Sequence, residues 1–429
     1  MFWNREKEIN LIKKSLGKSH FGILSGRRRI GKTALLRKVI QDFGGIYHQA
    51  IEGTATQQIE HFCFDLKDTF PIFANVTPKN WSEFFYLLSQ TQFPAIFVID
   101  ELPNLLQADS SAASLLQKFI DHDLENKKTL FLISGSSQSM LHSYFFNPSH
   151  ALYGRSHFHM KLGPLHYKWF CKQLKLKWTD PNTFLLFSLV GGIPHYWNLI
   201  PDSKDPIETA EYLYFNPSGL LADEPKNLLL DESITGDVPK AILDVIARGA
   251  HRLSEIAGRT GVKIQSLSKY MQVLVDLGLI IRHIPFGENP KNSKKSLYQV
   301  EDFCLLFYYG FVTKHRSKWP LYSKKQKLDI LTTHCQKAFE IYIRQNTLSG
   351  ERYWYKDQVE FDVVREDPSQ KNTLEIIECK WSKYSTKEKN SLVEKLQNKA
   401  AQSPLSTNIS KFNISICDQS NFTSFIEND

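Results

Sequence analysis

The feature that most constrains this chain is a glycine-rich loop between a short apolar segment and a helical pattern. Residues 20–25 predict a buried strand, and residues 34–43 have the apolar spacing of a helix. The loop between them reads G-x-x-x-x-G-K-T and consists of Gly26, Arg27, Arg28, Arg29, Ile30, Gly31, Lys32 and Thr33. Such a loop turns backbone N–H groups toward phosphate at a helix N-terminus, so it predicts a site for ATP with Mg²⁺. We expect Lys32 to reach the β and γ phosphates and Thr33 to hold Mg²⁺ through its hydroxyl.

Hydrolysis of a bound nucleotide needs an acidic partner at the end of a neighbouring strand. The apolar run at residues 95–99 predicts a strand buried on both faces, and Asp100 and Glu101 follow it directly. We expect Asp100 to coordinate Mg²⁺ through water and Glu101 to polarise the attacking water. A third apolar run, residues 129–133, leads into a serine-rich segment. Ser136 in this segment is predicted to contact the γ phosphate or the water, with a simple turn as the alternative.

The order of these segments resembles the additional-strand branch of P-loop ATPases, which includes the AAA+ and STAND groups. Three further stretches are similar to motifs of the archaeal-type family in that branch: F-W-N-R-E-K-E at residues 2–8, L-Y-G-R at 152–155 and G-G-I-P-H-Y at 191–196. The resemblance implies that Pro194 lies against the adenine or ribose side of the nucleotide. It also makes Arg155 a candidate arginine finger, acting in cis or from a neighbouring subunit of a homo-oligomer. A surface ion pair is the alternative role for Arg155.

The middle of the chain has the pattern of a winged helix. Helical patterns at residues 253–257 and 264–279 flank a turn at Gly261, and strand patterns at 280–285 and 297–300 follow. On DNA, such a domain places side chains of its second helix in the major groove and loop lysines on phosphates. The residues concerned are Gln265, Ser266, Ser268 and Lys269 on the helix, and Lys291, Lys294 and Lys295 in the loop. The alternative is a winged helix that docks on protein.

Positive charge is concentrated around this region. The chain has a net charge of +8, and between residues 282 and 327 ten Lys or Arg residues stand against three acidic residues. An excess of this kind is expected on a surface that faces a polyanion, so DNA is the predicted partner. A solvated loop is the alternative explanation of this charge.

Two strands are predicted near the C-terminus, at residues 358–364 and 374–381, and charged side chains alternate along both. Because side chains two residues apart share a face, Glu378 and Lys380 lie together. If the strands pair antiparallel across the polar link between them, Asp362 and Glu378 converge on one cation. Two carboxylates and a lysine in this arrangement suit a magnesium ion beside a phosphate group.

This D-x15-E-x-K arrangement resembles the PD-(D/E)xK superfamily of restriction-endonuclease-like domains, although the P-D dipeptide itself is absent. The resemblance implies a magnesium-dependent deoxyribonuclease in which Asp362 and Glu378 bind the metal and Lys380 stabilises the developing charge. Glu340, in a preceding helical pattern, is expected to add a third carboxylate. An inactive nucleic-acid-binding descendant and a solvated sheet face are the alternatives.

Together these features predict an α/β chain of four domains. A P-loop NTPase core at residues 1–160 is followed by a helical lid at 161–235, a winged helix at 236–310 and a restriction-endonuclease-like domain at 311–429. The apolar stretches are shorter than the roughly 18 residues of a membrane span, and six scattered cysteines and a charged start favour a cytoplasmic protein without a membrane partner.

The predicted function is that of an ATPase acting on DNA with a linked metal-dependent nuclease-like domain. The alternative is a regulatory, STAND-like ATPase. In that case the winged helix and an inactive nuclease-like domain only bind DNA or a protein partner.

Overall fold

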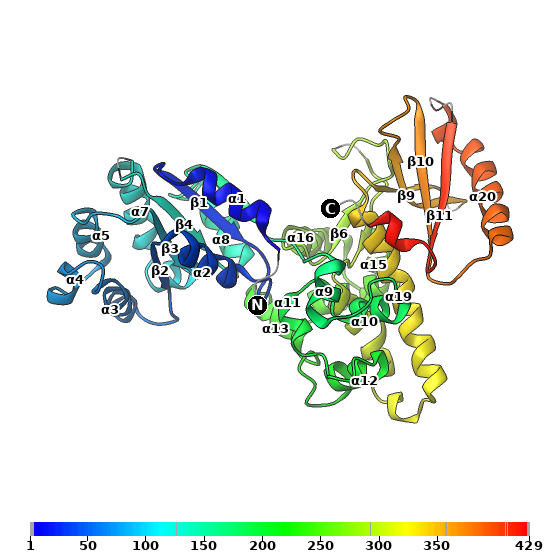
Figure 1. Cartoon of the computed structure of the whole chain (residues 1–429), viewed down its shortest axis with the longest axis horizontal. Coiled ribbons are helices and arrows are strands. Elements are labelled where there is room, and N and C mark those ends of the chain that lie inside the picture. Colours follow the sequence, from blue (N-terminus) through cyan, green and yellow to red (C-terminus); the bar gives the residue numbers. More distant parts are fainter. Residues whose placement is uncertain are drawn as a thin grey trace. The chain divides into compact units, whose positions relative to one another are not determined.

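The computed structural model describes residues 4–125, 127–291, 293–356, 358–407, 409 and 411–426. The chain divides into two compact units, and the division does not follow the order of the sequence (Figure 1). The first unit contains residues 1–169 together with two later segments, 193–195 and 228–233. The second unit contains residues 170–192, 196–227 and 234–429.

The first unit is built on a five-stranded parallel sheet with the strand order β2-β3-β4-β1-β5. Its strands are β1 (His20–Ser25), β2 (Ile46–Gln49), β3 (Ile96–Asp100), β4 (Leu130–Ser134) and β5 (Phe158–Lys161). Strands β3 and β4 are buried along their whole length, because apolar residues occupy both faces of these central strands. The placement of β4 between β1 and β3 agrees with the additional strand that the sequence predicts.

Helices pack on both faces of this sheet, as expected for parallel strands joined by crossover connections. The helical segments of the first unit are α1 (Glu6–Ser15), α2 (Lys32–Phe43), α3 (Ala55–Leu66), α4 (Ile72–Asn75), α5 (Trp81–Ser89), α6 (Leu102–Ala108), α7 (Ser111–Lys118), a π-helical turn η1 (Phe119–Asp123), α8 (Gln138–Phe146) and the start of α9 (Tyr167–Leu174). Aromatic rings fill the core beneath them, and Phe62 contacts both Phe84 and Phe97. This core fixes β3, whose end carries the predicted acidic residues.

The second unit begins with helices and a small two-stranded sheet. The helices are α10 (Pro181–Val190), α12 (Pro206–Ala210), η2 (Glu211–Phe215), α14 (Val238–Ala247), α15 (Leu253–Thr260), α16 (Ile264–Asp276), α17 (Phe303–Phe307), η3 (Tyr308–Val312), α18 (Thr313–His315) and η4 (Trp319–Leu321), while α11 (Pro194–Trp197) and α13 (Glu224–Asp231) are shared with the first unit. Strands β6 (Ile281–His283) and β7 (Leu297–Gln299) pair antiparallel. Gly261 ends α15 with a φ of 70°, a left-handed conformation that glycine adopts without strain and that lets the chain turn sharply into α16.

A four-stranded sheet with the order β11-β10-β9-β8 forms the C-terminal part of the second unit (Figure 1). It consists of β8 (Glu351–Tyr355), β9 (Val359–Glu366), β10 (Thr373–Lys380) and β11 (Lys411–Asp418), with α19 (Lys324–Asn346) before it, α20 (Thr386–Ala401) and η5 (Pro404–Thr407) between β10 and β11, and η6 (Phe422–Phe425) after it. Strands β9 and β10 pair antiparallel, which meets the condition under which Asp362 and Glu378 were expected to converge, whereas β10 and β11 are parallel. Helix α19 packs against β9 and β10. Among the described residues, every helix is too short or too polar to cross a membrane.

A buried histidine in α19 makes the stability of the second unit depend on pH. The Nε2–H group of His334 donates to the backbone oxygen of Ser188, 2.7 Å away, and burial lowers the pKa of His334 from 6.5 to about 4. The folded state therefore holds the neutral imidazole, whereas the unfolded chain takes up a proton as the pH falls through 6.5.

Lowering the pH from 7 to 5 is therefore expected to reduce the free energy of unfolding by about 2 kcal/mol through this group. Urea unfolding of the full chain at both pH values measures the loss. His334→Asn is expected to show a correspondingly smaller loss between the two pH values. An equal loss in the variant would contradict this account.

Candidate functional site

The glycine-rich loop joins the end of β1 to the start of α2, where the sequence predicts it. Gly26 and Gly31 have φ angles of 147° and 99°. A Cβ atom at Gly26 would lie 2.9 Å from the backbone oxygen of Leu162, so only glycine fits at this position of the loop. Lys32 is 5% exposed, and its Nζ atom donates to the backbone oxygens of Gly26 at 2.8 Å and Arg27 at 3.2 Å. The loop therefore encloses the lysine that is predicted to bind phosphate.

The surroundings of Lys32 combine burial with two nearby carboxylates. Burial lowers the pKa of the Lys32 ammonium, and the nearby carboxylates of Glu101 and Asp100 act in the opposite direction. An ammonium group held in this way keeps its donors aimed into the loop. Helix α2 begins at Lys32, so the positive end of its dipole adds to the attraction for an anion.

Asp100 lies at the end of β3, fully buried, and is surrounded by hydroxyl groups. Its Oδ2 atom accepts from Thr33 Oγ1 and from the Tyr47 hydroxyl, each 2.7 Å away, and Oδ1 accepts from the Ser134 hydroxyl. The structure thus brings Thr33 and Asp100 together, as predicted. A hydroxyl and a carboxylate are the hard oxygen ligands that Mg²⁺ prefers, so these residues fit a magnesium ion beside the nucleotide phosphates.

Glu101 follows Asp100 and points toward the end of β4. Its φ angle is 54°, which is uncommon for a residue other than glycine. The carboxylate accepts from the backbone N–H of Ser136 at 2.9 Å and from the Ser136 hydroxyl at 2.7 Å. In this structure Ser136 therefore holds Glu101 in place. Its predicted contact with the γ phosphate or the water stays a prediction.

The two residues implied by family motifs lie in different settings. The Nε atom of Arg155 donates to both carboxylate oxygens of Asp121, each at 3.0 Å, which is an ion pair of the kind named as the alternative. Pro194 opens α11 and is half-buried, and residues 193–195 belong to the first unit. The roles of Arg155 as a finger and of Pro194 at the nucleotide stay predictions.

The N-terminal motif reaches the loop through Arg5. This arginine is buried, and its Nη2 atom donates to the backbone oxygens of Ile30 at 3.2 Å and Gly163 at 2.9 Å. Phe2 and Trp3 of the same motif lie outside the described residues. Arg5 therefore stabilises the glycine-rich loop through a hydrogen bond to its backbone. Arg5 belongs to the sequence motif, but the motif alone does not reveal this contact.

A later segment of the chain adds residues that the sequence analysis did not single out. Glu232 accepts from the backbone N–H groups of Gln138 at 3.1 Å and Ser139 at 3.0 Å, at the N-terminus of α8. The neighbouring Asp231 forms an ion pair with Arg28 of the loop. More than ninety positions separate Glu232 from its partners, so no local pattern points to this contact. Tyr47 was also missed, because it lies on a short strand that the sequence analysis did not predict.

The second predicted constellation lies in the C-terminal sheet of the second unit. Asp362 is on β9, Glu378 and Lys380 are on β10, and Glu340 is on α19. The Oδ2 atom of Asp362 accepts from the backbone N–H of Cys379 at 2.8 Å, and Lys380 Nζ donates to Glu378 Oε1 at 2.7 Å. The antiparallel pairing of the two strands thus places the predicted side chains in one region of the sheet.

The charges of this region influence the pKa values of Asp362, Glu340 and Lys380. Burial, followed by the charges of Glu340 and Glu378, raises the pKa of Asp362 well above its usual value. Burial also raises the pKa of Glu340. Burial lowers the pKa of Lys380, but the hydrogen bond to Glu378 and the other carboxylates outweigh this effect, so its pKa is raised overall. Clustered acids that resist ionisation are a favourable setting for a cation.

The three carboxylates nevertheless do not form a group whose oxygen atoms all lie within 4.8 Å of one another. Binding a cation therefore requires their side chains to close in. Gln336 of α19, which the sequence analysis did not single out, connects the parts of this region. Its Nε2 atom donates to Glu340 and, at 3.1 Å, to the backbone oxygen of Cys379, while its Oε1 atom accepts from the Trp381 backbone.

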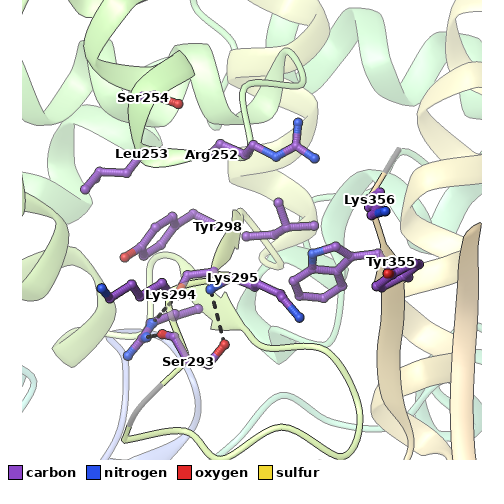
Figure 2. A pocket seen from close by; sticks show the side chains of 13 residues that line it. Arg252, Leu253, Ser254, Ser293, Lys294, Lys295, Tyr298, Tyr355 and Lys356 are labelled. Atoms are coloured by element: carbon purple, nitrogen blue, oxygen red, sulfur yellow. Dashed lines mark hydrogen bonds between the residues drawn. The ribbon is translucent and has the colours of Figure 1, made fainter. Parts of the chain in front are cut away.

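A basic pocket of about 590 Å³ lies in the second unit, between the loop joining β6 to β7 and strand β8. The charged and aromatic side chains that line it are Arg252, Arg282, Lys294, Lys295, Tyr298, Trp354, Tyr355 and Lys356. Figure 2 shows the Lys295 side chain extending toward the strand that carries Tyr355 and Lys356, whereas the ring of Tyr298 points away from that strand. Lys295 also forms an ion pair with Glu288, and Lys356 lies over the Tyr355 ring. Cations interleaved with aromatic rings are typical of surfaces that bind nucleic acid.

Comparison with known proteins finds a family whose sequences are similar to the first half of the chain. Residues 2–199 match the family described as an ATPase domain predominantly from Archaea. An uncharacterized protein of Methanocaldococcus jannaschii is 28% identical over 406 residues, which cover 89% of this chain and 88% of that protein. Sequence similarity to this relative therefore extends well beyond the matched domain.

Among solved structures, a Walker-type ATPase of Pyrococcus abyssi is similar, with a TM-score of 0.53 and 19% sequence identity. The similarity covers 72% of this chain and 96% of that protein, and at this identity it establishes the fold alone. Residues 2–199 are therefore similar in sequence to the archaeal ATPase domains, and the chain shares the fold of a Walker-type P-loop ATPase.

Proposed function

We propose that this protein hydrolyses ATP to control an action on DNA, and that its C-terminal sheet is a metal-dependent deoxyribonuclease domain. The observation that carries the proposal is the gathering of Glu340, Asp362, Glu378 and Lys380 within a chain that also contains a P-loop ATPase domain. An ATP site and a cluster of acids with a lysine in one chain favour energy-dependent work on a phosphodiester polymer.

In the ATPase site, each polar group has a chemical task. Lys32 and the backbone of the loop bind the β and γ phosphates, and Thr33 with Asp100 provides the oxygen ligands for magnesium, directly or through water. Glu101 orients and polarises the attacking water. The hydrogen bonds from Ser136 hold the Glu101 carboxylate in place. A magnesium ion held by Thr33 and Asp100 would neutralise charge on the phosphates.

The arrangement of α14, α15, α16 and the β6–β7 ribbon supports a winged helix as the DNA-contacting part. Leu267 of α16 is buried, whereas the neighbouring side chains predicted to enter a major groove are exposed: Gln265, Ser266, Ser268 and Lys269. The basic pocket described above lies between the loop of the β6–β7 ribbon and β8. A strand of DNA that follows the wing lysines therefore passes beside the C-terminal sheet of the same unit.

In the nuclease domain, Asp362 and Glu378 provide ligands for a divalent cation and Glu340 adds a further carboxylate. A divalent cation held by these residues would supply an activated water and would neutralise charge on the scissile phosphate. Lys380 stabilises the negative charge that develops on that phosphate. Its contact with Glu378 holds the ammonium next to the metal ligands.

Cleavage of a supercoiled plasmid and of a labelled single strand tests this proposal. We expect cutting by the full chain in Mg²⁺ or Mn²⁺, and an effect of ATP on its rate. An absence of cutting under all these conditions, with ATP hydrolysis and DNA binding intact, would overturn the nuclease assignment.

The substitution Glu101→Gln separates ATP binding from hydrolysis. The amide keeps the shape and the hydrogen bonds to Ser136 but does not polarise water, so we expect hydrolysis to fall by about a hundredfold or more with nucleotide affinity retained. Steady-state hydrolysis and nucleotide titration measure both quantities. Glu52→Gln, an exposed glutamate in the same unit, serves as the matched control. Unchanged hydrolysis in Glu101→Gln would contradict the role of Glu101.

A second function is favoured by one observation on α16. Three large apolar side chains on this helix are exposed: Ile264 at 50%, Tyr270 at 38% and Val273 at 45%. Tyr270 and Val273 are three positions apart and so lie on one side of the helix, where neighbouring exposed apolar side chains are typical of a protein interface. A regulatory ATPase whose winged helix docks on a protein partner would use them. Loss of DNA binding in Lys269→Ala, with wild-type binding in Val273→Ser, would exclude this candidate.

A further inference from the structure

We propose that His48, His61 and Asp65 form a binding site for zinc or a chemically similar divalent metal ion in the first unit. His61 and Asp65 are four positions apart on α3, so they lie on the same side of that helix. His48 lies on β2, against which α3 packs. The site is independent of the proposed actions on ATP and DNA.

The distances among the three side chains suit one small cation. His48 Nδ1 lies 2.7 Å from Asp65 Oδ2, and His61 Nδ1 lies 3.9 Å from the same oxygen. Ligand atoms in a tetrahedral zinc site, with bonds of about 2.0 to 2.1 Å, are separated by about 3.3 Å. Among the described residues, this is the one group of three such side chains whose ligand atoms all lie within 4.8 Å of one another.

An ordinary ion pair leaves part of this cluster unexplained. His48 makes its hydrogen bond to Asp65 through Nδ1, while the Nε2 atom of His48 and the Nδ1 atom of His61 are both buried without a hydrogen-bond partner among the described residues. The Nδ1 atom of His61 nevertheless faces the Asp65 carboxylate, at a distance too long for a hydrogen bond. A cation between the three groups would use the lone pairs of both imidazoles and the carboxylate charge at once.

The ligand set selects the class of metal. Two imidazole nitrogens and one carboxylate suit Zn²⁺ and its neighbours in the first transition series, whereas Mg²⁺ and Ca²⁺ prefer oxygen ligands alone. His48 is fully buried, while the side chains of His61 and Asp65 are 39% and 29% exposed, so an ion can enter from solvent. Three protein ligands leave a fourth position for water, as in open zinc sites.

The position of His48 in β2 separates this site from the ATP site. The preceding residue, Tyr47, donates to Asp100 beside the glycine-rich loop. Adjacent side chains in a strand point to opposite faces of the sheet, so His48 faces away from Asp100 and toward α3. A metal at His48 therefore does not compete with the magnesium ion expected at Thr33 and Asp100.

Zinc retained by the full chain after dialysis tests the proposal, with Asp362→Asn as the background so that the C-terminal carboxylates contribute little. We expect His61→Ala and Asp65→Asn to retain one equivalent less than this parent. We expect zinc affinity, measured by competition with a chromophoric chelator, to fall by at least about a hundredfold. His122→Ala and Glu60→Gln, which change exposed side chains of the same unit, should retain the parent amount.

Thermal unfolding provides a second measurement that does not depend on counting equivalents. Zinc should raise the unfolding temperature of the parent and of the two control variants, because an ion that binds the folded state stabilises it. It should leave His61→Ala and Asp65→Asn unchanged. Equal zinc retention by all variants, or no retained zinc in the parent, would overturn the site.

Discussion

Lys32→Ala is expected to reduce ATP hydrolysis by at least about a hundredfold, the usual cost of removing one donor that stabilises charge in a transition state. The loss should exceed what a surface lysine contributes, because the Lys32 ammonium is enclosed by the backbone oxygens of Gly26 and Arg27. Nucleotide affinity should fall as well, since the β and γ phosphates lose their ion-pair partner. Steady-state hydrolysis with a nucleotide titration measures both effects.

Lys38→Ala is the matched control for this substitution. Lys38 lies on the same helix, α2, and pairs with Asp42 one turn further along, so its removal costs a surface ion pair and no phosphate contact. It should hydrolyse ATP at close to the wild-type rate. Similar rates in Lys32→Ala and Lys38→Ala would show that the glycine-rich loop does not serve ATP hydrolysis.

Asp362→Asn is expected to abolish DNA cleavage and, at the same time, to stabilise the fold. Cleavage should fall by at least about a hundredfold, because the amide lacks the charge that holds a divalent cation. The hydrogen bond from the Cys379 backbone survives, since the amide oxygen still accepts it. Loss of cutting in this variant would therefore not be a consequence of unfolding.

The stabilisation follows from the raised pKa of Asp362. A carboxyl group whose pKa is higher in the folded chain than in the unfolded chain favours folding when protonated, and this contribution is lost as the pH rises through the folded-state value. At neutral pH without metal, a neutral amide should then raise the unfolding temperature of the second unit by about 2 to 4 °C for each kcal/mol gained. The gain should shrink as the pH is lowered toward 4.

Glu375→Gln is the control for both measurements. Glu375 lies on the same strand, β10, where it pairs with Arg365, and an odd number of positions separates it from Glu378, so it faces the other side of the sheet. It should cut DNA at the wild-type rate with no gain in stability. A destabilised Asp362→Asn variant with residual cutting would show that Asp362 is a structural residue.

The sequence predicts contacts best where regular geometry determines them. Thr33 and Asp100 meet because the carboxyl ends of parallel strands reach one edge of the sheet. Strand β4 is parallel to β3, so its carboxyl end lies at the same edge. Asp362 and Glu378 share a region because antiparallel strands with a period of two leave few alternative arrangements. In each case a local sequence pattern together with one topological rule is sufficient to predict which residues lie close together.

Other contacts depend on distant segments or on irregular backbone, and the sequence does not reveal them. Glu232 reaches the start of α8 only after the chain has passed through part of the second unit. Gln336 becomes a connecting residue because α19 packs on β10, which fixes both ends of its amide. The arrangement of His48 with α3 depends on β2, a four-residue strand whose pattern is too short to recognise.

The segment at residues 228–233 also determines how this protein can be divided. Asp231 and Glu232 belong to the first unit, where they hold the glycine-rich loop and cap α8, although they lie beyond residue 199. A fragment that ends at residue 199 would leave Arg28 without its acidic partner and the first N–H groups of α8 exposed. The stretch recognisable as an ATPase domain thus does not coincide with the first unit, because it includes residues 170–192 of the second unit and lacks residues 228–233. Excising or exchanging the ATPase domain would require residues 228–233 to be kept with it.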